Sequence, residues 1–309
     1  MIRFANMNGF SSFLLSLSSI TDKNAALSAC PGSGSFMNIE KYLARIGFTG
    51  TPAANLETLR EIHHLHPLAI PFENISSFTG APVSLEPDAV FHKLVTQGRG
   101  GYCFEQNLLL AQVLRDIGFG VSTHAARVIW HGIDKSTAPR THMLLRIGIG
   151  QDDWIADVGF GGLTMTAPLK LHDPSSQPSP HEEYRITRDG DDYMISAKLG
   201  DTWKAMYVFD LSSQQPADFA LANYFVATHP ESRFVQNLVM ARPFKNGRHA
   251  FFNNTWVKYS RDGQKTEKAL GNSAEVMTLI DEIFKISLQD SVDPNVLHKR
   301  LAEKLTESA

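Results

Sequence analysis

A glycine-rich loop followed at once by a helical pattern constrains this chain more than any other feature. Residues 99–115 read RGGYCFEQNLLLAQVLR. Apolar residues at helical spacing predict a helix from Cys103 to Ile117, ended by Gly118. Cys103 then lies in the first turn, where unpaired backbone N–H groups and the helix dipole stabilise an anion. We expect a thiolate nucleophile at this helix tip, with Arg99 holding the loop or adding to the positive field.

The segment before this helix is also helical in pattern. Apolar residues recur three and four positions apart over residues 38–46 and again from residue 55, and Gly47 and Pro67 are expected to end the two helices. The pattern predicts a helical domain over residues 37–120 that carries the nucleophile.

Three histidines stand near the end of the second predicted helix: His63, His64 and His66. They suggest a metal site, but no Cys, Asp or Glu stands nearby at matching spacing. The preferred interpretation is solvated histidines at a helix end.

Beyond residue 120 the apolar pattern becomes that of strands. Runs rich in β-forming residues cover residues 121–130, 142–149 and 154–158, and Asp189-Gly190 predicts a hairpin turn. These signals predict an antiparallel, barrel-like domain over residues 121–220.

The last third mixes short strand patterns with helices, one of them capped by Asn272 or Ser273. Residues 221–309 are therefore expected to form an α/β lid. The predicted fold class is α+β, with a helical domain, a barrel-like middle domain and this lid.

Composition limits the partners. The chain has 309 residues, of which 43% are hydrophobic and 20% charged, and its formal net charge is −3. Without a basic excess, nucleic acid is not an expected partner. Two cysteines make neither a disulfide framework nor a cysteine-rich metal site, which suits a reducing cytoplasm. The oligomeric state is left open, with a homo-oligomer as one option.

The first 36 residues are unusual. Residues 10–20 are mildly apolar, yet they are too short and serine-rich to span a bilayer. Residues 27–30 resemble a lipoprotein cleavage box, but the apolar run lies too far upstream for an export signal. We expect no membrane association, and residues 1–36 are either a disordered extension or an over-extended translation start.

A nucleophilic cysteine needs a base, and the base needs an orienting group. His142 opens one predicted strand, and Asp157 interrupts the apolar run of the next. A buried carboxylate is costly unless it is paired, so His142 is its expected partner.

The strand register supports this pair. Their residue numbers have an odd sum, as cross-strand pairs do in hairpins closed by two- or four-residue turns, so both side chains share a face. A turn centred on residues 149–150 sets them directly opposite. One centred on residues 151–152 moves them four residues apart, so the catalytic hypothesis requires the earlier turn.

Each residue alone has an ordinary explanation. A cysteine at a helix start is more often packing than chemistry, and a single strand histidine is usually a satisfied surface or core residue. Asp157 alone could be an acid in a turn or at a barrel rim.

In combination, the motifs resemble the arylamine N-acetyltransferase family. The glycine–cysteine motif is preceded by Pro-Phe-Glu-Asn at residues 71–74 and followed by Thr141-His142 and by Asp-Val-Gly-Phe-Gly at residues 157–161. The similarity runs from about residue 37 to the C-terminus, and only the first 36 residues depart from the pattern.

The resemblance implies a cysteine-protease-like triad of Cys103, His142 and Asp157. It also implies a ping-pong transfer of acetyl from acetyl-CoA, without a metal, to an arylamine, arylhydrazine or arylhydroxylamine, as in xenobiotic metabolism. Backbone N–H groups near Cys103 are expected to stabilise the oxyanion. Arg99, Glu105 and Asn107 are interpreted as supports of the active-site helix.

The resemblance also suggests binding residues. The acceptor slot is expected to involve Phe72, Val128, Phe160 and Phe234, although ordinary core packing explains Val128 and Phe234 equally well. Trp130, Thr141, Gly159 and Gly161 match positions near the coenzyme A entrance. Backbone N–H groups of residues 159–162 could reach the pyrophosphate.

Two rival functions remain open at this point. A hydrolase, either a peptidase or an amidase, could use the same thiol triad with water as the acceptor. A binding module without catalysis is the second rival. The sequence leaves the physiological acceptor and other acyl-CoA donors undetermined.

Overall fold

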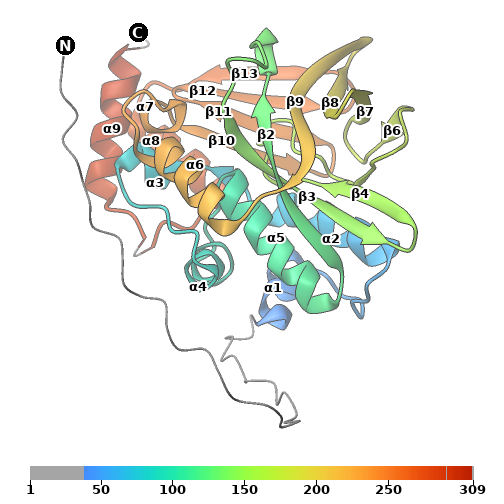
Figure 1. Cartoon of the computed structure of the whole chain (residues 1–309). Coiled ribbons are helices and arrows are strands. Elements are labelled where there is room, and N and C mark those ends of the chain that lie inside the picture. Colours follow the sequence, from blue (N-terminus) through green and yellow to red (C-terminus); the bar gives the residue numbers. More distant parts are fainter. Residues whose placement is uncertain (1–37, 290, 308–309) are drawn as a thin grey trace, which may run out of the picture. The chain divides into compact units, whose positions relative to one another are not determined.

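A computed structural model describes residues 38–289 and 291–307 of the chain (Figure 1). The predictions about residues 1–36 lie outside the described residues.

The first two helices are α1, Ile39–Ile46, and α2, Leu56–Ala69. Gly47 ends α1 in the left-handed conformation with φ of 75°, as predicted. Pro67, however, does not end α2, because proline removes only one N–H donor and lies in the last turn. The N–H of Ile70 still donates to the carbonyl of His66 at 2.8 Å, which closes the helix two residues later.

The segments that lead to the nucleophile are short. They are β1 (Phe72–Glu73), α3 (Ile75–Thr79), α4 (Pro87–Phe91) and a π-helical turn (His92–Thr96). Helix α5 then spans Cys103–Ile117, the predicted bounds, and Gly118 ends it with φ of 105°.

The middle of the chain forms an eight-stranded antiparallel sheet in the order β5-β4-β3-β2-β9-β8-β7-β6. Strand β5 also approaches β7, so the sheet curls into a nearly closed barrel, as predicted (Figure 1). Its strands are β2 (Gly120–Val128), β3 (Arg140–Ile149), β4 (Asp152–Ala156), β5 (Leu169–Lys170), β6 (Gln177–Pro178), β7 (Glu183–Asp189), β8 (Asp192–Leu199) and β9 (Thr202–Ser213).

The turn between β3 and β4 corrects the expected register. Leu145 pairs with Ala156, and the two turn residues are Gly150, with φ of 63°, and Gln151. Neither turn considered from the sequence forms. Continued along this register, His142 and Asp157 share a face but are offset by two residues, and the predicted need for a directly opposite pair is wrong.

A β-bulge lies beside the site on the other edge of β3. Ala126 of β2 pairs with His142, whereas the next residue, Arg127, pairs with Arg140. Thr141 is therefore the extra residue, and bulges of this kind re-aim backbone groups.

A second sheet has the order β1-β10-β11-β12-β13. Its later strands are β10 (Val239–Phe244), β11 (Gly247–Phe252), β12 (Thr255–Ser260) and β13 (Lys265–Ala269). The helices of this region are α6 (Pro216–Thr228), α7 (Arg233–Gln236), α8 (Ser273–Glu282) and α9 (Pro294–Glu307). Asn272 caps α8 through its side chain, one of the two predicted options.

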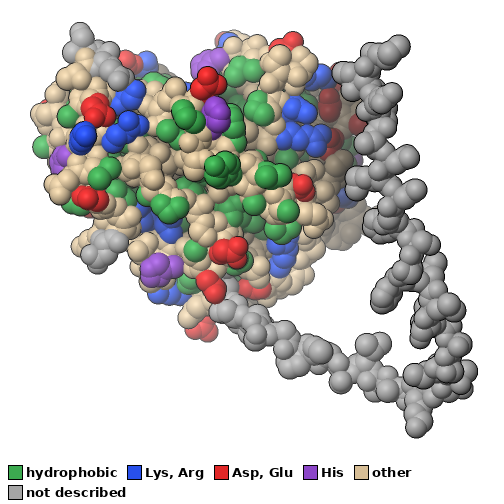
Figure 2. Space-filling model, turned by 60° about the vertical axis from the view of Figure 1, so that its left-hand side comes forward, with side chains coloured by type: hydrophobic (Ala, Val, Ile, Leu, Met, Phe, Trp, Pro, Cys, Tyr) green, Lys and Arg blue, Asp and Glu red, His purple; other side chains and the backbone are tan. Residues whose placement is uncertain are grey.

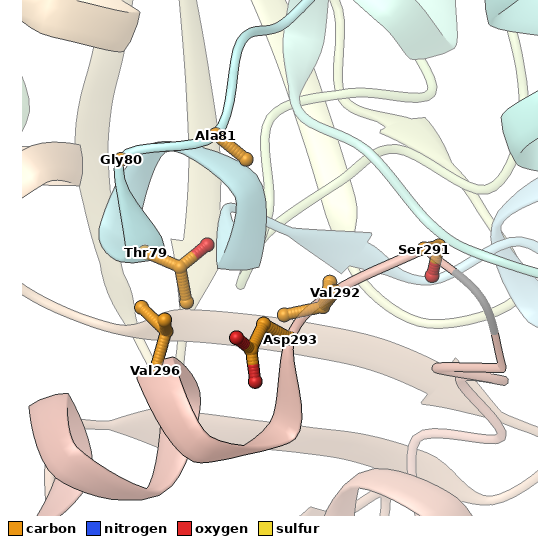
Figure 3. Close-up of a pocket in the computed structure, with 7 residues that line it drawn as sticks. All are labelled: Thr79, Gly80, Ala81, Ser291, Val292, Asp293 and Val296. Atoms are coloured by element: carbon orange, nitrogen blue, oxygen red, sulfur yellow. The ribbon is translucent and has the colours of Figure 1, made fainter.

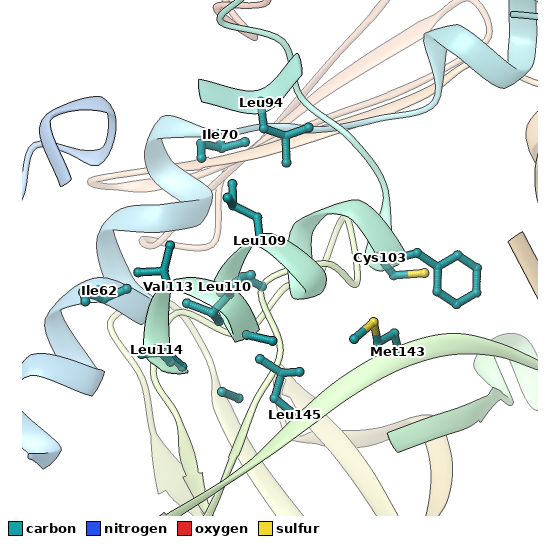
Figure 4. Packing of buried hydrophobic residues seen from close by; sticks show 14 of the residues in the cluster. Ile62, Ile70, Leu94, Cys103, Leu109, Leu110, Val113, Leu114, Met143 and Leu145 are labelled. Atoms are coloured by element: carbon teal, nitrogen blue, oxygen red, sulfur yellow. The ribbon is translucent and has the colours of Figure 1, made fainter. Parts of the chain in front are cut away.

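The three predicted domains share a sheet and a hydrophobic cluster. Strand β1, from the first predicted domain, pairs with β10, from the last, through Phe72 and Ala241. The largest hydrophobic cluster also draws on all three segments. In Figure 4, Cys103 stands at the tip of α5 with Met143 of β3 nearby, and Leu110 lies further along the helix. The boundaries at residues 37–120, 121–220 and 221–309 stay predictions.

Some apolar side chains reach the surface. On α6, Leu221 and Tyr224 are more than two-thirds exposed, whereas Phe219 is buried. Figure 2 shows hydrophobic side chains among charged ones of both signs on the face it presents, as is usual for folded proteins. None of the helices in the described part of the chain combines the length and apolar character needed to cross a membrane.

A buried ion pair holds the loop before α5. Arg99 donates to Oε1 of Glu73 from Nε at 3.0 Å and from Nη2 at 2.7 Å, and both side chains are almost fully buried. Arg99 also donates to Ser291 at 3.0 Å, and the N–H of Ile75 donates to Oε2 of Glu73 at 2.6 Å. The pair therefore links three segments that are distant in sequence.

Replacing Arg99 by methionine should lower the unfolding free energy by about 3–5 kcal/mol, because it leaves the Glu73 carboxylate buried without its partner. Urea denaturation at pH 7 measures this loss. The double variant Arg99→Met/Glu73→Gln should recover most of the stability. Equal instability of the single and double variants would contradict this explanation.

Candidate active site

Cys103 is the first residue of α5 and is only 4% exposed. The N–H of Tyr102, the preceding residue, donates to Oε2 of Glu105 at 3.1 Å, and Lys93 pairs with the other carboxylate oxygen at 2.6 Å. A side chain at Gly101 would come within 2.7 Å of the same carboxylate. A larger residue at position 101 would therefore displace the Glu105 side chain that accepts from the N–H of Tyr102.

The thiol faces the strand hairpin. Its Sγ lies 3.6 Å from the carbonyl oxygen of Thr141, the bulged residue of β3. His142, the next residue, is buried, and Cys103 is close enough to contribute to the raised pKa of its imidazole. The cysteine and the histidine are thus brought together, as predicted from the sequence.

His142 and Asp157 form a direct hydrogen bond. Nε2 of the imidazole lies 2.7 Å from Oδ2 of the carboxylate, and both side chains are buried. Burial alone would lower the pKa of His142. The charge of Asp157 and hydrogen bonds to Asp157 and Cys103 outweigh burial and raise this pKa to about 10. His142 is therefore an imidazolium at neutral pH.

Four donors surround the Asp157 carboxylate. Oδ2 also accepts from the hydroxyl of Tyr207 at 2.9 Å, while Oδ1 accepts from Asn107 at 3.0 Å and from the N–H of Gly159 at 2.9 Å. Burial would raise the pKa of Asp157, but the His142 charge and these hydrogen bonds lower it. The acid stays ionised although it is fully buried.

Sequence reasoning missed two of these partners. Asn107 was interpreted as a helix support, yet it contacts the acid directly; its position four residues after Cys103, on the same helix face, could have indicated this. Tyr207 had no sequence signal, because only the pairing of β9 with β2 places it beside the site.

Gly159 allows the turn that carries Asp157 to approach Cys103. A Cβ built at this position would lie 2.6 Å from the Cα of Cys103 and 3.0 Å from the Asn107 side chain. Real Cβ atoms do not approach backbone this closely, so any larger residue must push the turn away from α5.

Three predicted acceptor residues lie around the site. The Phe160 ring contacts His142 edge-on with 5.4 Å between ring centroids, and Phe72 contacts Phe234 in the same way at 5.8 Å. Gly161, which follows Phe160, lies beside the Phe72 ring: a Cβ built there would be 3.5 Å from it. Val128 pairs with Tyr207 across β2 and β9 and is partly buried.

Two of the predicted coenzyme A residues use their backbone N–H groups within the protein. The N–H of Gly159 donates to Asp157, and the N–H of Gly161 donates to Thr164 at 2.6 Å. These two donors are engaged within the protein, and the use of residues 159–162 at the pyrophosphate stays a prediction. Thr141 forms the bulge, and Trp130 is partly buried against the same hydrophobic cluster as Phe160.

The histidines of α2 also require correction. His63 and His66 are fully buried, not solvated, and His64 is partly buried. His66 hydrogen-bonds Tyr42 at 2.8 Å and Gln106 at 2.7 Å. Across residues 38–289 and 291–307, no group of three or more His, Cys, Asp or Glu side chains is arranged to hold a metal ion.

A cavity of about 530 Å³ opens elsewhere, between the end of α3 and the start of α9 (Figure 3). Its lining includes Thr79, Asp293 and Val296 and none of the three predicted catalytic residues. It is separate from the candidate active site.

Comparison with known proteins agrees with this fold. A family model described as N-acetyltransferase matches residues 55–292. The chain is 37% identical over 254 residues to the arylamine N-acetyltransferase of Escherichia coli (strain K12), covering 82% of this chain and 90% of that protein. It is 35% identical over 253 residues to a Salmonella typhimurium protein named arylamine N-acetyltransferase / N-hydroxyarylamine O-acetyltransferase, with 82% and 90% covered.

A solved structure is similar over nearly its whole length. Mycobacterium marinum arylamine N-acetyltransferase in complex with CoA matches with a TM-score of 0.83 and 33% identity, covering 86% of this chain and 99% of that one. These matches place the chain among the acyltransferases. It belongs to the arylamine N-acetyltransferase family, which confirms the resemblance found in the motifs.

Replacing Gly159 by alanine should destabilise the protein by roughly 1–3 kcal/mol, because the new methyl group overlaps the Cys103 backbone. Acetyl transfer should fall by about 100-fold as the turn moves away from the thiol. Urea denaturation and steady-state kinetics measure both effects. Gly162→Ala is the matched control, since a Cβ there meets nothing within 4 Å; equal behaviour of the two variants would contradict the explanation.

Stability should fall as the pH drops from 6 to 5, partly because of His66. Burial, partly offset by the hydrogen bond to Gln106, lowers its pKa from 6.5 to about 4, so the unfolded chain binds more protons in this window. His142, whose pKa is raised, is protonated in both states there. His66→Gln should reduce the slope of unfolding free energy against pH by about 1 kcal/mol per pH unit. An unchanged slope would contradict burial of a neutral His66.

Proposed function

We propose that this chain transfers acetyl from acetyl-CoA to aromatic amines through an acetyl-cysteine at Cys103, with His142 and Asp157 completing a triad. The observation that carries the proposal is the arrangement of the three side chains. The Cys103 thiol lies 3.6 Å from the carbonyl of Thr141, next to His142, whose imidazole meets the buried Asp157 carboxylate at 2.7 Å.

In the first half-reaction, the Cys103 thiolate attacks the thioester carbonyl of acetyl-CoA. A carbon–sulfur bond forms to Cys103 and the bond to coenzyme A sulfur breaks. Coenzyme A takes a proton from the His142 imidazolium and leaves as a thiol, so His142 is neutral for the next step. The first N–H groups of α5 have no intrahelical acceptor, and we assign them as donors to the developing oxyanion.

In the second half-reaction, the acceptor nitrogen attacks the acetyl-cysteine. The new carbon–nitrogen bond forms as the bond to Sγ breaks, and His142 takes the proton that the nitrogen loses. Asp157 stabilises the resulting imidazolium, while its other donors hold it in place. The enzyme returns to its thiolate–imidazolium state.

Aromatic rings around the site support an aryl acceptor. Phe160 stands edge-on beside His142, and Phe72 and Phe234 lie beyond Gly161. Rings in this arrangement offer edge and face contacts to a flat aromatic substrate. We extend the acceptors to arylhydrazines and arylhydroxylamines, and the name of the Salmonella protein, which includes N-hydroxyarylamine O-acetyltransferase, supports the latter.

Coenzyme A as donor is supported by the M. marinum complex. In this chain we assign its approach to the side of Thr141 and Trp130, because the Thr141 bulge lies against the thiol. Gly159 and Gly161 contribute there through close backbone packing. A reducing cytoplasm is the proposed compartment, since it keeps Cys103 as a free thiol.

Incubation with acetyl-CoA alone should place one acetyl group on each chain, located on Cys103 by peptide mass spectrometry. The label should persist until an arylamine is added and then leave as the N-acetyl product. A panel of aromatic amines and hydrazines identifies the acceptor range. Cys103→Ser should fold normally and accept no acetyl group.

Transfer retained by Cys103→Ser would refute the nucleophile. Failure to form an acetyl-enzyme, together with hydrolysis of amide substrates, would instead support a thiol hydrolase.

A further inference from the structure

One fully buried histidine contacts the proposed triad without belonging to it. Nε2 of His63, on α2, lies 3.1 Å from the backbone nitrogen of Asp157 and accepts its N–H. This contact joins the helical segment to the acid-bearing turn. The N–H that His63 accepts belongs to Asp157, and the side chain of Asp157 orients His142.

The contact defines the state of the His63 ring. An accepting Nε2 carries no proton, so the proton is on Nδ1, which has no hydrogen-bond partner among the described residues. Burial lowers the pKa of His63 to about 3. The Asp157 charge opposes this shift, and neighbouring His66 and His64 add to it. His63 therefore stays neutral throughout the physiological range.

The same helix also supports the nucleophile loop. Nε2 of His66 contacts Oε1 of Gln106 at 2.7 Å. The Gln106 amide donates to the carbonyls of Pro71 at 2.8 Å and Gly101 at 3.2 Å, just before Cys103. Residues three apart on a helix share a face, so one face of α2 contacts both halves of the site.

We propose that His63 is a positioning residue for acyl transfer: as a neutral acceptor it fixes the Asp157 peptide and, with His66, sets the spacing between acid and nucleophile. This inference rests on the triad proposed above. A purely packing role for His63 would need only its volume, whereas positioning needs an acceptor atom at Nε2.

Two substitutions at position 63 distinguish the loss of the hydrogen-bond acceptor from a change in side-chain volume. His63→Leu fills the space without an acceptor, whereas the amide oxygen of His63→Gln can reach the place of Nε2. His64→Leu, on the same helix but away from the triad, is the matched control. The readout is the single-turnover rate of Cys103 acetylation by acetyl-CoA, measured against pH, with thermal unfolding in parallel.

His63→Leu should acetylate about tenfold more slowly than the wild type, because the acid is displaced. The decline in rate at high pH, which follows deprotonation of His142, should move to lower pH as that imidazolium loses part of its partner. His63→Gln should restore both features, and His64→Leu should match the wild type. Wild-type rates and pH profile in His63→Leu, or equal impairment of both His63 variants, would overturn the proposal.

A measurement on the wild-type chain tests the proposal even if His63→Leu does not fold. Nitrogen-15 NMR at pH 7 should show a coupling across the hydrogen bond between Asp157 N and His63 Nε2, with Nε2 unprotonated. A doubly protonated His63 or no coupling would overturn the proposal. Absence of acetyl-Cys103 in the wild type refutes the proposed function instead, and the NMR result then still decides the role of the His63 contact.

Discussion

The buried carboxylate of Asp157 is the constraint on which the site depends. An ionised group without solvent is costly unless donors replace the water it has lost. Its four donors come from β3 (His142), β9 (Tyr207), α5 (Asn107) and its own turn (Gly159). The barrel and the nucleophile helix must therefore stay in contact for the acid to remain charged, which ties the fold to the chemistry.

Backbone geometry contributes as much as side-chain contacts do to the position of the Cys103 thiol near Asp157. The Thr141 bulge turns a carbonyl toward Sγ, and Gly159 lets the acid-bearing turn touch the first residue of α5. Gly101 similarly admits the Glu105 carboxylate that caps the helix. Thr141, Gly159 and Gly101 all lie in the motifs that resemble the family. Each permits a close approach that a larger side chain, or a strand without a bulge, would hinder.

Local rules explain what could be predicted. The bounds of α5 follow from a glycine on either side of an apolar run, and the shared face of His142 and Asp157 follows from strand alternation. The two-residue offset could not be predicted, because it depends on which residues close the turn. The burial of His63 also could not, since a helix pattern does not say what packs on its polar edge; here a distant turn supplies an N–H donor.

Two buried histidines meet the same acidic residue and take opposite states. His142 contacts the Asp157 carboxylate, whose charge raises the pKa of the imidazole to about 10 despite burial. His63 contacts the Asp157 peptide N–H, which offers no charge, and burial lowers its pKa to about 3. Because a backbone donor requires a neutral acceptor and a carboxylate favours a cation, one residue gives the chain both a charged partner for the thiol and an uncharged support behind it.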